Sequence, residues 1–246
     1  MGANGRVLVL DIRNRRISEY ARANNRLAHV RDVRLPHRTT DFCILGERLF
    51  TVGAPAEREL IQEIGSAGNV VRSFARREEP PRALLERLGT RAGQILRSEY
   101  NVAGLYCDPP SNRVIVQYWG APIVRAYSPD GALLWSKELP EFYYPEPGVA
   151  HAGALEWRFN GSTGLWSSGK AVFMDQNDHL FVSFGVRELR GVGWVDTRVL
   201  SSTNGANVER FKGDEVWATA SGDYVYGYRQ HPFPQVVKYK LRHSNR

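Results

Sequence analysis

The chain has 246 residues, of which 42% are hydrophobic and 24% are charged, so it can bury a sizeable core and is not a disordered chain. No stretch approaches the roughly 20 consecutive apolar residues of a membrane-spanning helix. The N-terminal apolar run is too short for a signal peptide. We expect one globular domain over residues 1–246, with no membrane span.

The formal net charge is +7, from 33 Lys+Arg against 26 Asp+Glu. A basic protein attracts polyanions, but nucleic-acid binders carry their charge in clusters. The densest group here is Arg13, Arg15 and Arg16, and the other arginines are spread among acidic residues. This pattern disfavours a nucleic-acid partner. Nucleic-acid binding is therefore a third hypothesis, after the binding module and the enzyme described below.

The first predicted element is a pair of short strands at Arg6–Tyr20 (RVLVLDIRNRRISEY). Its pattern returns without a gap at Arg113–Tyr127 (RVIVQYWGAPIVRAY) and more loosely at Asp223–Tyr239. Strands that resemble RVLVL begin near residues 7, 49, 114, 180 and 224. Two of the intervals match the roughly 40–50-residue period of propeller blades, and the other two equal one period plus an insertion. The repeats therefore predict an all-β array.

The two insertions fall at about 76–100 and 140–169. The first (PPRALLERLGTRAGQILRSE) predicts a short helix, with Leu84, Leu85 and Leu88 on one face and a break near Gly89. The second is rich in aromatic residues and predicts a small hairpin between residues 156–159 and 164–166.

Four short strands can be assigned to each complete repeat. In the third repeat they are Val102–Cys107, Arg113–Tyr118, Ile123–Tyr127 and Ala132–Leu139. In the fourth repeat they are Ala171–Met174, His179–Phe184, Trp194–Leu200 and Asn207–Phe211. Four-stranded antiparallel units repeated in this way predict a β-propeller.

The segment VLVLDIRNRRISEY resembles a blade of the bacterial six-bladed propellers related to the NHL and YVTN repeats, and SPDGALLW and TRVLSSTNGANVER resemble the outer hairpins of that group. The resemblance covers nearly the whole chain and implies six four-stranded blades. Five units are visible, because the first lacks its inner strand and the last its outer strand. Either the chain is a five-bladed or open propeller, or an upstream piece of a six-bladed propeller is missing. We favour the missing upstream piece.

One face of the expected propeller is more elaborate than the other. Both insertions join the last strand of one blade to the first strand of the next. They lie at the same end of the sheets as the longer loops between the second and third strands of a blade. Aromatic and arginine side chains on such loops suit a binding surface. We predict a non-catalytic binding module for a protein, peptide or glycan that uses this face. The candidate binding residues are Trp119, Tyr143, Tyr144, His151, Trp157, Arg158, Arg229 and His231.

The alternative is an enzyme at the mouth of the central channel. The resemblance implies that some relatives are metal-dependent lactonases or lyase-like enzymes, which hold a divalent cation with carboxylates and amides. Residues of these types that precede inner strands are Asp41, Glu99, Asn101 and Asp214. No catalytic motif is present, so we assign no catalytic residue and expect no other cofactor.

The two cysteines, Cys43 and Cys107, lie in apolar runs and match no metal-ligand spacing. We expect buried free thiols. The absence of an export signal in the chain as written favours the cytoplasm. If the N-terminus is truncated, we expect a periplasmic or secreted protein instead.

Overall fold

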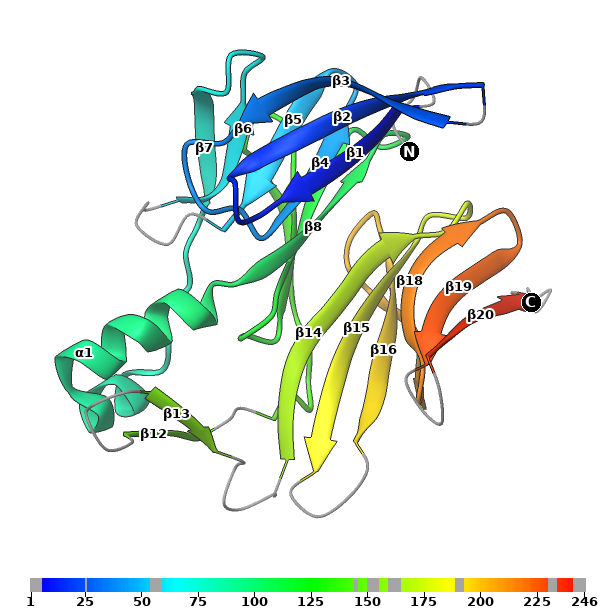
Figure 1. Ribbon diagram of the computed structural model, residues 1–246. Coiled ribbons are helices and arrows are strands. Elements are labelled where there is room, and N and C mark those ends of the chain that lie inside the picture. The colour runs from blue at the N-terminus through cyan, green and yellow to red at the C-terminus, as the bar shows by residue number, and fades with distance from the viewer. Residues whose placement is uncertain are drawn as a thin grey trace. The chain divides into compact units, whose positions relative to one another are not determined.

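The structure is a computed structural model that describes residues 6–24, 26–53, 59–143, 146–149, 155–158, 165–188, 193–229 and 234–240. It consists of antiparallel sheets that follow one another along the chain (Figure 1). Contacts between residues divide the chain into two compact units. Unit 1 comprises Met1–Arg77, Leu105–Ile115 and Ala126–Leu133, and unit 2 comprises Glu78–Gly104, Val116–Arg125 and Leu134–Arg246.

Unit 1 contains the first two sheets. The first sheet has the order β1 (Arg6–Asp11), β2 (Arg16–Ala23), β3 (Arg26–Arg34). The second has the order β4 (Asp41–Leu45), β5 (Arg48–Val52), β6 (Glu59–Ile64), β7 (Val70–Arg76). Ile17, Val33 and Ile64 form a buried cluster between these sheets, because alternate residues of each strand face the same side.

The third sheet has strands that contribute residues to both units. Its order is β11 (Leu133–Glu138), β10 (Ile123–Tyr127), β9 (Arg113–Tyr118), β8 (Ala103–Asp108). These bounds agree with the predicted strands to within about one residue at each end. The alternating pattern and the Ser128–Gly131 turn, where Gly131 has a φ of 93°, therefore located this sheet correctly.

Unit 2 contains the last two sheets. The fourth has the order β14 (Leu165–Met174), β15 (His179–Glu188), β16 (Trp194–Ser201), β17 (Asn207–Gly213). The fifth has the order β18 (Val216–Ser221), β19 (Tyr224–Arg229), β20 (Gln235–Lys240). An edge-to-face aromatic contact from Phe211 to Trp217 joins these two sheets, and Trp217 makes a second such contact with Tyr239 within the fifth sheet.

The fold is an all-β propeller of antiparallel blades with a four-strand plan. Within the described residues the blades number five, and the first and the last have three strands each. The predicted propeller is therefore confirmed, whereas the six-bladed type is not.

The first insertion forms a longer helix than predicted. Helix α1 (Arg82–Tyr100) continues through Gly89 without a break. A single glycine costs only about 1 kcal/mol in a helix. The C-terminal half of α1 buries Leu96 and Tyr100, and this burial offsets that cost. The predicted break is therefore wrong.

The hairpin in the second insertion pairs differently from the prediction. Strand β13 (Leu155–Arg158) pairs with the preceding strand β12 (Glu146–Val149). Of the predicted partner at residues 164–166, Leu165 and Trp166 instead begin β14, which pairs with β15 in nine residue pairs. The longer ladder satisfies more backbone groups, so Leu165 and Trp166 belong to the blade. Helix α1 contacts both strands of the hairpin, so the two insertions meet (Figure 1).

The expectation of free thiols is wrong, because Cys43 and Cys107 form a disulfide. They lie on β4 and β8, the first strands of the second and third sheets, with a Cα–Cα distance of 5.5 Å. The neighbouring Leu105 N–H donates to the Asp41 carboxylate at 2.8 Å. Sequence spacing did not indicate the pair, because the blade repeat separates the two cysteines by 64 residues.

Removing the disulfide should destabilise unit 1. A cross-link that closes a loop of this length restricts the unfolded chain and is worth about 4 kcal/mol. We expect Cys43→Ala, Cys107→Ala and the double variant to lose similar free energy of unfolding in urea titrations. Reduction should lower the stability of the parent protein and leave the double variant unchanged. Parent stability that is insensitive to reduction would contradict the disulfide.

Candidate functional site

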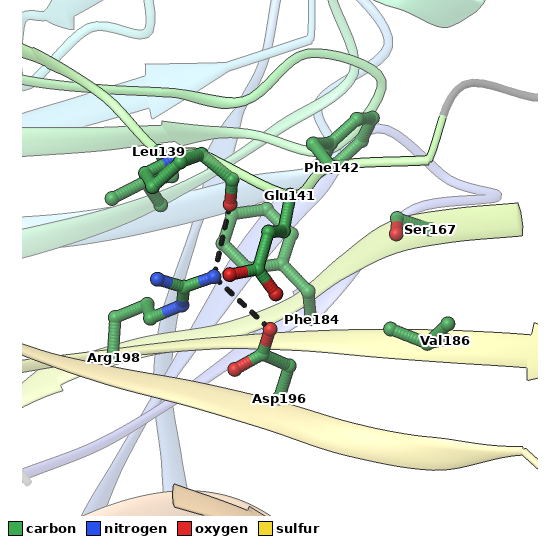
Figure 2. Close-up of a pocket in the computed structure, with 9 residues that line it drawn as sticks. Leu139, Glu141, Phe142, Ser167, Phe184, Val186, Asp196 and Arg198 are labelled. Carbon is green, nitrogen blue, oxygen red and sulfur yellow. Dashed lines mark hydrogen bonds and ion pairs between the residues drawn. The ribbon is translucent and has the colours of Figure 1, made fainter. Parts of the chain in front are cut away.

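A pocket in unit 2 lies where the connection that follows β11 passes β14, β15 and β16 (Figure 2). The free space among its lining atoms amounts to about 230 Å³ when the part open to solvent is counted, and the closed part holds little more than one water molecule. Phe142 of the connection packs edge-to-face on Phe184 of β15, with ring centroids 5.5 Å apart, and these rings form part of the apolar wall. The lining residues are Leu139, Pro140, Glu141, Phe142, Ser167, Phe184, Val186, Asp196 and Arg198.

Arg198 is the principal polar group of the pocket. Its side chain is only 7% exposed, so its positive charge is largely removed from water. One nitrogen, Nη2, donates both to the Pro140 carbonyl oxygen at 2.9 Å and to Asp196 Oδ2 at 3.2 Å (Figure 2). No described residue accepts a hydrogen bond from Nε or Nη1. The guanidinium therefore keeps donors for another acceptor.

Arg210 holds the two carboxylates of the site together. Its Nε and Nη2 donate to Asp196 at 3.0 and 2.7 Å, and its Nη1 and Nη2 donate to Glu141 at 2.7 and 2.6 Å. These hydrogen bonds lower the pKa of Glu141, and the same bonds raise the pKa of Arg210. Glu141 is therefore ionised at neutral pH.

The strand register explains why these charges meet. Asp196 and Arg198 are two residues apart on β16, so they share one face of the strand. Arg198 lies directly opposite Arg210 of β17. The two arginines carry like charges, and Asp196 lies within hydrogen-bond distance of both. The sheet therefore presents a charge cluster that needs a further acid, which Glu141 supplies from the connection.

The connection is held tightly where it enters the site. Glu141 has a φ of 60°, a left-handed conformation that is uncommon outside glycine and is maintained only when surrounding contacts require it. Two residues later, Tyr143 N–H donates to Ser167 Oγ at 3.1 Å, and the Tyr143 carbonyl accepts from Ser167 N–H at 2.7 Å. The chain is therefore fixed at both ends of this short segment.

The structure brings two predicted binding residues, Trp119 and Tyr143, to the same strand edge. The Trp119 carbonyl accepts from Gly169 N–H at 3.0 Å, two residues along β14 from the contact of Tyr143 with Ser167. The Trp119 ring also packs closely on Gly169, and its Nε1 is buried without a hydrogen-bond partner among the described residues.

The remaining predicted binding residues are placed in part. Trp157 and Arg158 lie on β13, opposite Pro147 and Glu146 of β12. Arg229 ends β19, where it pairs with Glu215 and lies 3.5 Å from the Tyr239 hydroxyl. Burial opposes ionisation of Glu215, but the hydrogen bonds from Arg229 and Tyr239 prevail and lower its pKa. Tyr144, His151 and His231 lie outside the described residues.

Two of the predicted metal ligands, Asp41 and Asn101, form hydrogen bonds with backbone groups. Asp41 accepts N–H bonds from Phe42 and Leu105, both at 2.8 Å, and burial raises its pKa. The Asn101 side chain is occupied by backbone groups of Glu78 and Arg97. In the described part of the chain, no three His, Cys, Asp or Glu side chains are grouped to hold a metal ion.

Two further metal candidates are only partly described. Glu99 is in α1, and its side chain is outside the described set. Asp214 is exposed just before β18. The divalent-cation site remains a prediction.

Sequence reasoning missed the three charged residues that line the pocket, Glu141, Asp196 and Arg198, and also Arg210, which pairs with the two carboxylates. One usable signal was present: Asp196 and Arg198 occupy alternate positions in a strand whose other residues are uncharged, WVDTRVLS. Charges on one face of a buried strand require partners. The sequence does not indicate that Arg210 and Glu141 are those partners, since they are 12 and 57 residues away from Arg198.

Comparisons with known proteins inform the fold alone. The sequence matches no protein-family model and no curated protein. A member of the DUF4221 family from Bacteroides vulgatus ATCC 8482 is 6% identical, with a TM-score of 0.55 over 97% of this chain and 76% of that one. A protein from Bacteroides fragilis NCTC 9343 proposed to be exported is 10% identical, with a TM-score of 0.53 over 93% of this chain and 64% of that one. The chain thus spans just under two thirds of the second protein.

No helix of the described residues is long and apolar enough to cross a membrane. The resemblance to NHL- and YVTN-type propellers is confirmed at the level of a propeller fold and no further.

The stability provided by Glu141 should depend on pH. Its pKa is lowered in the folded protein, so its contribution is complete above the ordinary value of 4.5 and is lost as the pH falls through the lowered value. Urea titrations should show a larger loss of stability for Glu141→Gln at pH 7 than at pH 3. Glu138→Gln, which removes an exposed glutamate of β11, is the charge-matched control. A loss that is equal at both pH values would contradict the ion pair.

A methyl group at position 169 should disturb the packing of Trp119. A Cβ there would lie 2.8 Å from Trp119 Cγ and 2.9 Å from its Cα, and the backbone contact cannot be relieved by rotating a side chain. We expect Gly169→Ala to cost about 2 kcal/mol in thermal or urea unfolding. Gly93→Ala in α1 is the control, because a Cβ there would have no contact closer than 3.7 Å. Unchanged stability in Gly169→Ala would contradict this contact.

Proposed function

We propose that the chain is a non-catalytic binding module that holds a protein or peptide partner at the Arg198 pocket and the adjoining insertions. The partner contributes a carboxylate to Arg198. The adjoining surface consists of Tyr143, helix α1 and the hairpin of β12 and β13. All these parts belong to unit 2.

The observation that carries the proposal is the incomplete hydrogen bonding of Arg198. The side chain is more than nine-tenths buried, yet both protein acceptors use the same nitrogen, Nη2. A carboxylate matches the geometry of a guanidinium and can accept from the donors that the protein leaves unused. The apolar rings of Phe142 and Phe184 beside it suit the hydrocarbon part of a ligand.

The two insertions support a macromolecular partner. They are separated in sequence by the whole third blade, yet α1 contacts β12 and β13. This contact forms a surface larger than the pocket alone. Trp157 and Arg158 lie on β13, and aromatic and arginine residues are frequent anchors in protein interfaces. Tyr143 connects this surface to the pocket through its bonds to Ser167.

The carboxylates of the pocket favour binding over acid–base chemistry. A general acid or base works best with a pKa near the operating pH. The pKa of Glu141 is instead lowered by Arg210. Asp196 is occupied by hydrogen bonds from Arg198 and Arg210. Both carboxylates therefore support the position of the arginines.

We also propose an oxidising compartment, such as the periplasm. Disulfides persist mainly outside the reducing cytosol, and the Cys43–Cys107 pair supports this location. The similar Bacteroides fragilis protein, itself proposed to be exported, agrees with it.

The binding proposal is tested with peptides of known sequence. A random peptide library displayed on phage is selected on the immobilised protein, and an enriched acidic peptide is synthesised with carboxylate groups and with the matching amides. Isothermal titration calorimetry then measures both forms against the parent, Arg198→Lys and Arg125→Lys. Arg125 is the control, since it is a half-buried arginine of unit 2 that pairs with Glu78 at 2.6 Å, outside the pocket.

We expect Arg198→Lys to bind the carboxylate peptide at least tenfold more weakly, equivalent to about 1.4 kcal/mol, because lysine lacks the guanidinium fork. Arg125→Lys should bind like the parent, and the amide peptide should bind weakly to all three proteins. Equal affinity of Arg198→Lys and the parent would refute the pocket as the site. Chemical conversion of the bound peptide would refute the non-catalytic function.

A further inference from the structure

The first sheet carries most of the net charge of the protein. Residues 6–34 hold eight arginines and three acidic residues, a formal charge of +5 out of the total of +7. This sheet belongs to unit 1 and shares no residue with the Arg198 pocket.

All three acids of this sheet are occupied by partners within it. Glu19 is nearly buried and pairs with Arg6 and Arg31. Asp32 accepts from Arg16 Nη1 at 2.6 Å and from Ser18 Oγ at 2.7 Å. These acids therefore neutralise only part of the arginine charge.

The third acid, Asp11, shapes the turn between β1 and β2. It accepts from the Asn14 backbone N–H at 3.1 Å and from Asn14 Nδ2 at 2.6 Å. Its Oδ2 also accepts from Arg16 Nε at 3.2 Å. The acid thus stabilises the turn that carries the neighbouring arginines.

Three arginines are left exposed at one end of the sheet. Arg16 lies opposite Arg34 in the register of β2 and β3, and the Arg15 carbonyl accepts from Leu35 N–H at 2.8 Å. These contacts place the turn at residues 12–15 next to the end of β3. Arg13, Arg15 and Arg34 form no ion pair with any described residue. Residues 12–16 together with Arg34 are called the arginine end below.

An apolar side chain accompanies these charges. Ile12, in the same turn, is 43% exposed, and Val9 of β1 is 47% exposed. Exposed apolar side chains beside arginines are typical of surfaces that contact lipid, where cations bind headgroup phosphates and the apolar side chain enters the interface. Nucleic-acid surfaces instead place aromatic rings beside the cations for base stacking. Tyr20 packs edge-to-face on His29 within the sheet.

We propose that the arginine end docks on an anionic lipid bilayer. Arg13, Arg15 and Arg34 bind headgroup phosphates, and Ile12 enters the interfacial region. This is peripheral attachment through a sheet end, and it is independent of the partner pocket in unit 2.

The test is co-sedimentation of the full chain with vesicles of 70% phosphatidylcholine and 30% phosphatidylglycerol, and with pure phosphatidylcholine. The variants are Arg13→Gln/Arg34→Gln, Ile12→Ser and the control Arg82→Gln/Arg97→Gln. The control removes the same charge from exposed positions of α1. Circular dichroism verifies folding of each variant, and heparin retention is measured in parallel.

We expect binding to the anionic vesicles only, falling at least tenfold between 50 and 300 mM salt because the charges are screened. The Arg13/Arg34 variant should bind at least tenfold more weakly, and the α1 control less than twofold more weakly. Ile12→Ser should reduce vesicle binding at least threefold and leave heparin retention unchanged. Absence of binding to anionic vesicles at 50 mM salt would overturn the proposal. Equal losses in the two arginine variants, or full vesicle binding by Ile12→Ser, would also overturn it and indicate a general polyanion attraction.

Discussion

A guanidinium that is removed from water must find acceptors, and the site in unit 2 is arranged around that requirement. Arg198 is buried on β16, and its hydrogen bonds reach Asp196 on its own strand and the Pro140 carbonyl of the connection. Arg210 extends the network to Glu141. These bonds link the connection to the sheet at Pro140 and Glu141, beside the pocket that Phe142 lines.

The two units use arginine in opposite ways. In the fourth sheet Arg198 is buried and Arg210 is half-buried, and both pair with carboxylates. In the first sheet the acids pair within the sheet and leave several arginines in solvent. A buried ion pair contributes mainly to specific geometry, whereas exposed charges act over several ångströms on approaching polyanions. The same residue type therefore forms a buried, paired cluster in one sheet and an exposed basic surface in the other.

The insertions add to the propeller without changing its blades. The third sheet precedes the β12–β13 hairpin in the chain and the fourth sheet follows it, and each sheet has four strands. Helix α1 and the hairpin contact each other, so part of the surface of each insertion is covered by the other. Such an arrangement allows loops to acquire binding residues while the blades preserve the hydrogen-bonded framework.

The sequence by itself determined the blades, because period-two alternation, turn glycines and the repeat interval are local properties of the chain. It located the third sheet closely, and it proposed Trp119 and Tyr143 as candidate binding residues. The structure places both along one edge of β14, and their binding role stays a prediction. The sequence did not indicate the Cys43–Cys107 bond, the uninterrupted helix, the pairing of β12 with β13, or the partners of Arg198. Only the tertiary structure decided these features, because each depends on segments that become neighbours when separate strands and blades pack together. The local pattern records which residues face a core, and packing alone decides which distant residue meets them.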